Sequence, residues 1–207
     1  MNRFLIFSLF LVLFLTSCGS YQYPHAVGIR DSHVQVLNTY YTDTTRSFVY
    51  KADVEAFGKK LGGSLLIATV AADVHRVALV SDFGQTLIDI SLFPDRQVVH
   101  YVMDDLNKRM LVNELADVFR TLTEQRHASS ALIFMDKQHY PVYAANDVYY
   151  TVEERQVTNM LRVKGKKERF VIAFDQVKKD IPTRINIQHK KYPMMMNFTL
   201  DAKQSTL

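Results

Sequence analysis

The sequence predicts a mainly β protein of the α+β class: a curved antiparallel sheet or unclosed barrel of about 11 strands, with one amphipathic helix inserted mid-chain. From Ser47 onward, apolar and polar residues alternate in short runs, which is typical of half-buried strands. Only a few turn residues separate these runs, so successive strands must pair antiparallel. Between about Asp105 and Glu124 the period changes once to that of a helix.

The first eighteen residues predict an exported, lipid-anchored protein. Arg3 is followed by a run from Phe4 to Leu15 that is apolar except for one serine, and this run is too short to cross a bilayer. Cys18, the single cysteine, ends the tetrapeptide Leu-Thr-Ser-Cys, which resembles the lipobox of bacterial lipoproteins. The resemblance implies that residues 1–17 are a signal peptide and that the Cys18 thiol carries a diacylglycerol. The alternatives are a plain secretory signal and an N-terminal membrane anchor.

The composition of the mature chain, Cys18 to Leu207, favours one globular domain with a sizeable core. Without Arg3, 24 basic side chains face 21 acidic ones, so the net charge is about +3. The basic residues are interspersed with acids instead of forming one stripe, which argues against a nucleic-acid partner. Acylation of Cys18 leaves no thiol for a disulfide, so the core alone must stabilise the domain.

Residues 18–46 predict an acylated tether and lead-in, because they are mostly polar and contain Pro24 and Gly28. The folded domain is expected at 47–207, without an internal repeat or a second linker. Its first five strands are expected at 47–55, 64–71, 73–80, 86–92 and 97–103, with a glycine-containing turn from Gly58 to Gly63 after the first strand.

The helix is predicted by apolar residues that recur at spacings of three and four: Leu106, Met110, Leu111, Leu115, Val118, Phe119 and Leu122. We expect Asp104, Asp105 or Asn107 to cap its start. Seven further strands are expected after the helix, at 131–135, 140–143, 148–152, 157–163, 170–174, 184–188 and 194–200.

No motif of catalysis or metal binding emerges from the sequence. Asp82-Phe83-Gly84 matches the letters of the kinase magnesium motif, but no phosphate loop accompanies it, so it predicts a turn. None of the seven histidines lies within four residues of another, and we expect no metal, cofactor or catalytic residue. Asp89 interrupts an apolar strand; either it lines a cavity or it faces water.

Two features point to binding instead. Met194, Met195 and Met196 place flexible, polarizable side chains on both faces of one strand, which suits an adaptable apolar site or ordinary core filling. Leu61 lies between two lysines and two glycines in the expected turn. It is a candidate for contact with a membrane, or an exposed leucine of no consequence.

A lipobox, an antiparallel meander, a mid-chain helix and a second run of strands together resemble the LolA/LolB-type lipoprotein-localisation fold. That fold is an unclosed barrel, lidded by helices, whose apolar cavity takes lipoprotein acyl chains. The stretches from Phe57 to Ile67 and from Val80 to Ile90 also resemble small lipoproteins of Bacteroidetes-type bacteria, through Gly-x-Leu-x-Ile and x-Phe-Gly-x-x-Leu-x-Asp segments. No residue aligns with the protruding-loop leucine of LolB, so no functional residue is carried over.

These observations favour a non-enzymatic, membrane-anchored periplasmic lipoprotein that binds a lipid or the acyl chain of another protein in a β-sheet cavity. The alternative is a structural or assembly lipoprotein with a solid core that docks a membrane protein complex. A third hypothesis is a hydrolase in which His75 or His100 meets a carboxylate. Gly19 and Ser20 after the cysteine favour the outer membrane under enterobacterial-type sorting.

The expected walls of the cavity are apolar residues from the helix and from late strands: Leu111, Leu115, Phe119, Phe170, Ile172, Phe174, Met194, Met196 and Phe198. A continuous cavity would favour the ligand-binding hypothesis, and a filled core would favour the docking hypothesis.

Overall fold

Thirteen strands form one sheet in the computed structural model. The structure describes residues 21–24, 27–32, 38–125, 131–136, 138, 140–145, 147–178 and 180–206. For residues 27–32 and 131–134 it describes the backbone and not the side chains. The strands are β1 (Val27–Ser32), β2 (Ser47–Ala56), β3 (Lys59–Ala71), β4 (Val74–Ser81), β5 (Thr86–Leu92), β6 (Gln97–Val102), β7 (Ala131–Met135), β8 (Pro141–Ala145), β9 (Val148–Glu153), β10 (Gln156–Lys164), β11 (Lys167–Lys178), β12 (Ile181–His189) and β13 (Met194–Leu200).

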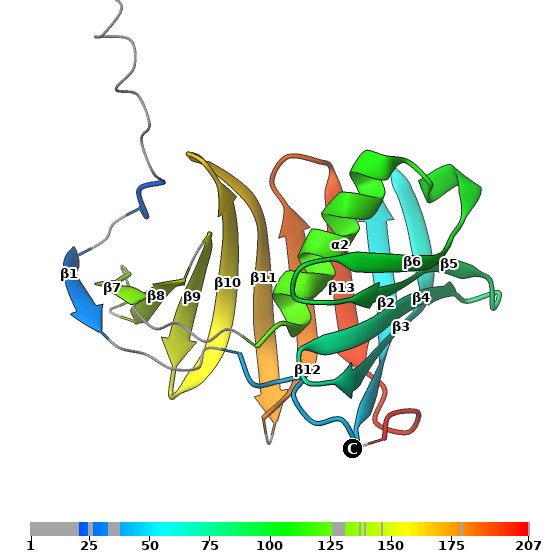
Figure 1. Ribbon diagram of the computed structural model, residues 1–207, viewed down its shortest axis with the longest axis horizontal. Helices are drawn as coiled ribbons and strands as arrows, with labels where there is room; N and C mark the ends of the chain where they lie inside the picture. The colour runs from blue at the N-terminus through cyan, green and yellow to red at the C-terminus, as the bar shows by residue number, and fades with distance from the viewer. Residues whose placement is uncertain are drawn as a thin grey trace, which may run out of the picture.

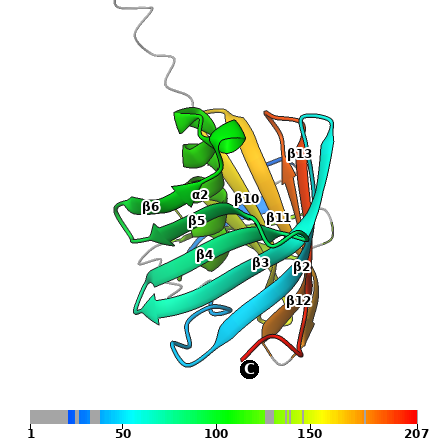
Figure 2. The same ribbon diagram turned by 90° about the vertical axis from the view of Figure 1, so that its right-hand side faces the viewer.

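The sheet is antiparallel throughout and does not close. Its spatial order is β1-β7-β8-β9-β10-β11-β12-β13-β2-β3-β4-β5-β6, so β1 and β6 are the two edges. Figures 1 and 2 show that the sheet is strongly curved and that the helix lies inside the curve. The predicted fold class is therefore confirmed, with 13 strands where about 11 were expected.

Two meanders make up the sheet, and the helix separates them in the sequence. Strands β2 to β6 follow one another in order, and so do β7 to β13. Strand β13 then pairs with β2, which places Met196 opposite Val54 and Phe198 opposite Ala52. Strand β1, in the stretch expected to be lead-in, pairs with β7. Both pairings are long-range, so no local pattern in the sequence predicts them.

Alternating burial shows which side of each strand faces the core. In β13, Met194, Met196 and Phe198 are buried, whereas Met195 is 40% exposed. Successive side chains of a strand point to opposite faces, so the buried set lines the concave face. Met195 lies on the solvent side.

The turn between β2 and β3 is shorter and earlier than expected. It consists of Phe57 and Gly58, whose φ angles of 52° and 77° are those of a type I′ hairpin turn. Leu61 consequently lies within β3, opposite Val54, and packs partly buried against the core. The expectation of Leu61 at an exposed tip is therefore corrected: the exposed apolar residue of this turn is Phe57.

The helix begins later than expected. Asp104 and Asp105 lie in a separate short 3-10 helix, η1 (Asp104–Leu106), and α2 (Arg109–Thr123) follows. The residue that precedes α2 is Lys108, with an extended backbone and no side-chain hydrogen bond to the first turn. None of the predicted capping residues therefore caps α2. No helix among the described residues is long and apolar enough to span a membrane.

The last part of the expected lead-in packs into the core. Tyr41 is fully buried, and its hydroxyl lies 2.9 Å from that of Tyr50, which in turn donates to the carbonyl of Pro182. The backbone carbonyl of Tyr41 accepts from Thr69 Oγ1 at 2.9 Å and lies 2.7 Å from His75 Nε2. The folded part of the chain thus extends upstream of Ser47.

Replacing Gly63 with alanine should destabilise the first meander. A Cβ atom at Gly63 would lie 2.1 Å from the carbonyl oxygen of Val80 and 3.0 Å from Ser81 Cα, so the β3–β4 pair would have to separate. We expect Gly63→Ala to lower the free energy of unfolding by about 1–3 kcal/mol in urea titrations. Ser64→Ala, at the next and half-buried position, is the matched control and should change it by less than about 0.5 kcal/mol.

Candidate ligand site on the concave face

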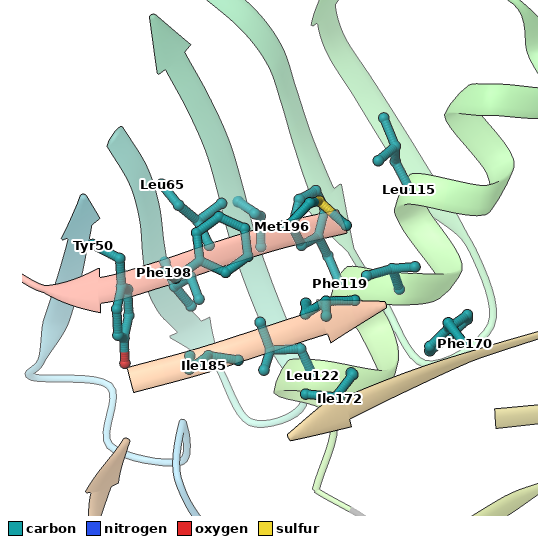
Figure 3. Packing of buried hydrophobic residues seen from close by; sticks show 14 of the residues in the cluster. Tyr50, Leu65, Leu115, Phe119, Leu122, Phe170, Ile172, Ile185, Met196 and Phe198 are labelled. Atoms are coloured by element: carbon teal, nitrogen blue, oxygen red, sulfur yellow. The ribbon is translucent and has the colours of Figure 1, made fainter. Parts of the chain in front are cut away.

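One apolar side of α2 covers the concave face of the sheet. Figure 3 shows Phe119 and Leu122 of the helix beside labelled side chains of β11, β12 and β13, with Leu115 farther along the helix. Phe119 and Leu122 have no exposed surface. Full burial of such a side chain is worth about 1.5–3 kcal/mol, so this stripe provides most of the attachment of α2 to the sheet.

The structure brings the nine predicted cavity residues together in one layer between α2 and the sheet. Leu111 is partly buried there, and the other eight are at most 7% exposed. Phe119, Phe170, Ile172 and Phe198 expose no surface at all, so no space large enough for water lies beside them. The helix fills the region in which a ligand cavity was expected, and these residues form a packed core.

The C-terminal end of α2 is firmly anchored. Asn38 Nδ2 donates to the carbonyl oxygens of Leu122 at 2.8 Å and Glu124 at 3.2 Å, which are acceptors that the helix cannot satisfy internally. Thr121 and Thr123 are buried beside them. The backbone of the lead-in segment and the end of the helix are therefore held to each other inside the domain.

The N-terminal half of α2 is held by polar contacts along its flank. Glu114 forms an ion pair with Arg169 of β11, and its other carboxylate oxygen lies 3.1 Å from His189 Nε2. These side chains are 15% exposed or less, so solvent screens the contact only partly. One turn later, Asp117 pairs with Arg162 of β10 at 3.3 Å, in a more exposed position. We call these four charged residues and His189 the helix latch.

The hydrogen bonds of His189 determine its charge. Nδ1 accepts from the backbone N–H groups of Lys191 at 3.1 Å and Tyr192 at 3.0 Å, so Nδ1 carries no proton and Nε2–H donates to Glu114. Protonation of Nδ1 would break both backbone hydrogen bonds. Burial, with help from the charges of Arg169 and Lys191, lowers the pKa of His189 to about 4, against the weaker opposing effect of Asp117. His189 is therefore neutral at pH 7.

A polar cleft of about 420 Å³ opens on the same flank of the helix. Its walls are the side chains of Asn113, Glu114, Asp117, Asp147, Arg162, Val163, Lys164 and Arg169. Acids and bases alternate around it, and the helix latch forms one side. Such a lining does not suit an acyl chain, so the candidate site for an apolar ligand is the layer beneath α2.

Sequence reasoning missed Asn38, Glu114, Arg169 and His189. Their partners lie 55 to 86 residues away along the chain, so no spacing in the sequence indicates the contacts. One signal was available, because Glu114 and Asp117 are three residues apart and share a helical face. Two acids on the flank of an apolar stripe are compatible with cationic partners on the sheet.

The other candidate residues lie outside this layer. Asp89 makes a bidentate pair with Arg76, 3.0 and 2.7 Å, on the solvent face of the sheet, which agrees with the solvent-facing alternative. His75 is buried against the Tyr41 carbonyl, and burial lowers its pKa. His100 lies 2.8 Å from Ser91 Oγ on an exposed face. In the part of the chain that the structure describes, no three His, Cys, Asp or Glu side chains could hold a metal ion.

The predicted signal peptide and Cys18 lie outside the described residues. The same is true of His25, His33, His127 and His139. The lipidation of Cys18 therefore remains a prediction from the sequence.

Comparison with known proteins finds similarity only among solved structures. No family model matches the chain, and no curated protein matches it. A LolA superfamily protein from Nitrosomonas europaea is 10% identical with a TM-score of 0.44, over 81% of this chain and 88% of its own. A DUF1329 family protein from Desulfovibrio piger is 9% identical with a TM-score of 0.42, over 77% and 85%.

A third structure, described as an outer membrane lipoprotein-sorting protein domain from Vibrio parahaemolyticus, is 8% identical with a TM-score of 0.37, over 78% of this chain and 86% of its own. Two of these structures are described in terms of the LolA superfamily or lipoprotein sorting. Because all three TM-scores are below 0.5, the likeness carries no argument about a ligand or a partner.

The helix latch should make stability depend on pH. The pKa of His189 is about 4 in the folded chain and about 6.5 when unfolded, so the unfolded chain binds more protons between these values. The stabilisation by neutral His189 is complete above pH 6.5 and is lost as the pH falls toward 4. Urea titrations across this range should show a declining free energy of unfolding.

His189→Gln is the matched variant, because its side-chain amide can still donate to Glu114 but does not titrate. The difference between the two proteins isolates His189 from His75, which acts in the same direction. Parallel pH profiles for wild type and variant would contradict the assignment of a neutral, buried His189.

Proposed function

We propose that the chain is a membrane-anchored, non-enzymatic lipoprotein of the periplasm that binds an apolar ligand between the concave face and α2. The ligand would be a lipid or the acyl chain of another lipoprotein. The observation that carries the proposal is the continuous apolar layer beneath α2, which a single helix covers. Displacing part of that helix would expose apolar strand faces to which an acyl chain could bind.

The two ends of α2 are unequally attached, which indicates how the layer would open. The C-terminal half carries Val118, Phe119 and Leu122, all without exposed surface, and is capped by Asn38. The N-terminal half has no side-chain cap, and Met110 is 56% exposed. Ion pairs with partial exposure contribute about 1 kcal/mol or less each, far less than the buried stripe. The helix would therefore swing outward from its N-terminal end.

A second candidate function is docking to a membrane protein complex without any ligand. The packed interior favours it, because Phe119, Phe170 and Phe198 are fully buried beneath α2. The two functions differ in whether α2 moves. The first requires the helix to leave the sheet, and the second does not.

The tether is part of the proposal and has its own test. If Cys18 is acylated, cells given a radiolabelled fatty acid should incorporate it into the wild-type protein and not into Cys18→Ser. Mass spectrometry should find a mature N-terminus at Cys18. A mature protein that begins elsewhere and carries no label would show that the N-terminal segment is an ordinary secretory signal or an anchor.

Ligand binding should loosen one half of α2. In the presence of a fluorescent fatty acid, we expect faster hydrogen exchange at residues 109–117 and unchanged exchange at residues 118–123. The fluorescence of the fatty acid should increase, because the probe enters an apolar site. Glu114→Gln weakens the helix latch by about 1 kcal/mol and should speed uptake by about fivefold.

Asp89→Asn is the matched control, because it removes a carboxylate from an ion pair on the opposite face of the sheet. It should leave uptake unchanged. If the probe does not bind to any of the three proteins and exchange in α2 is constant, the docking function replaces ligand binding.

A further inference from the structure

Three hairpins at one end of the sheet each have two adjacent lysines in the turn or directly beside it. Strands β10, β11, β12, β13, β2 and β3 are consecutive neighbours, so the turns β10–β11, β12–β13 and β2–β3 lie side by side at the same end. Figures 1 and 2 show these turns together with the N-terminal end of α2. We call the six exposed lysines at these turns the lysine rim: Lys59, Lys60, Lys166, Lys167, Lys190 and Lys191.

The opposite end of the sheet has no comparable set among the described residues. Its connections carry both signs of charge: Glu154 beside Arg155, Asp95 beside Arg96, Asp180 after Lys178, and Asp201 near Lys203. Opposite charges there compensate one another. At the lysine end, Glu55 lies opposite Lys60 and Glu168 follows Lys167, so the six lysines exceed these acids and leave a net positive charge.

Phe57 gives the cationic end an exposed aromatic tip at a cost in stability. In a type I′ turn both central residues need positive φ, which asparagine and glycine adopt easily and phenylalanine does not. Phe57 nevertheless has φ 52° and is 53% exposed. Neither its conformation nor its exposure stabilises the fold, and a strained residue that the fold does not require points to a function.

The aromatic tip and the lysines belong to one surface. The ring of Phe57 lies 6.2 Å from that of Tyr192, and its N–H donates to the Pro193 carbonyl at 2.9 Å. Lys191 Nζ lies 4.8 Å over the Tyr192 ring, and the Tyr192 hydroxyl contacts Met110 Sδ at 3.1 Å. Two turns of the sheet and the start of α2 thus meet around Tyr192.

We propose that the lysine rim docks the domain on a bilayer surface rich in anionic phospholipid, with Phe57 inserted among the headgroups. Lysines attract anionic lipid, and aromatic rings favour the interface between headgroups and acyl chains. The charges lie on separate turns around an apolar tip, an arrangement that fits a flat, charged and partly apolar surface. A nucleic acid would be matched better by a cationic groove with stacking platforms.

This docking sets the orientation of the domain. With the lysine rim on the bilayer, the loosely held N-terminal end of α2 faces the lipid. The proposal does not depend on ligand binding in the concave face, because the lysine rim and Phe57 are surface features of the closed molecule. Failure of either experiment leaves the other interpretable.

Vesicle co-sedimentation tests the proposal with the mature chain, residues 18–207, carrying Cys18→Ser so that no acyl anchor contributes. We expect binding to phosphatidylcholine vesicles that contain about one-third phosphatidylglycerol, and release at about 0.5 M salt. Vesicles of phosphatidylcholine alone should bind at least about tenfold more weakly. Equal binding to both vesicles, or no binding to either, would overturn the proposal.

Two double variants distinguish the effect of the lysine rim on vesicle binding from the effect of net charge. Lys59→Ser with Lys60→Ser should weaken binding about tenfold or more, whereas Lys51→Ser with Lys203→Ser, which removes the same charge elsewhere, should not. If the two double variants lose binding equally, net charge alone is responsible and the site is rejected. Tighter binding of heparin than of anionic vesicles would assign the rim to a soluble polyanion instead.

Phe57→Asn provides a variant that cannot fail by misfolding, because an Asn-Gly pair is the preferred sequence of this turn. We expect it to keep or raise the melting temperature while weakening vesicle binding. Val70, 61% exposed near the opposite end of β3, is the control, and Val70→Asn should leave binding unchanged. Loss of binding in both variants, or in neither, would remove Phe57 from the site.

Discussion

The constraint on which this structure depends is that an open, curved sheet has a concave apolar face that it cannot bury against itself. A closed barrel would cover that face with its own far wall, but here β1 and β6 remain separate edges. The amphipathic helix α2 supplies the missing layer, with Phe119 and Leu122 fully buried against the strands. The lead-in adds Tyr41, whose hydroxyl meets that of Tyr50. The two segments convert an incomplete barrel into a packed core.

Covering a sheet with one helix also makes that helix the element with most freedom to move. All strands except the edges β1 and β6 are held on both sides by hydrogen-bonded neighbours, whereas α2 depends on its apolar stripe, the Asn38 cap and the helix latch. The latch is of a kind that can be broken: its charges are partly exposed, and one member, His189, is neutral only while its pKa stays low. Stability and access to the concave face are therefore linked through the same few contacts.

Binding to a membrane surface would use residues that do not stabilise the fold. Phe57 adopts a backbone conformation that phenylalanine avoids, at a turn where its ring is half exposed. The six lysines of three neighbouring hairpins outnumber the acids beside them, of which Glu55 lies opposite Lys60 and Glu168 follows Lys167. Together with a lipid on Cys18, such a surface would fix both the distance and the orientation of the domain relative to the bilayer. The helix end that opens most easily would then lie nearest to the lipid.

The sequence by itself determined the elements that local pattern controls. Alternation predicted most strands, the three-and-four spacing predicted α2, and the same apolar spacing identified the nine residues from Leu111 to Phe198 that pack together. Only the tertiary structure decided the pairing of β13 with β2, the filling of the concave face and the latch between Glu114 and His189. It also showed that the exposed apolar residue at the β2–β3 turn is Phe57 and not Leu61. The first three features join residues that are distant in the sequence, and the position of the tip depends on the register of the β2–β3 hairpin. Long-range contacts and register leave no periodic signal in the chain.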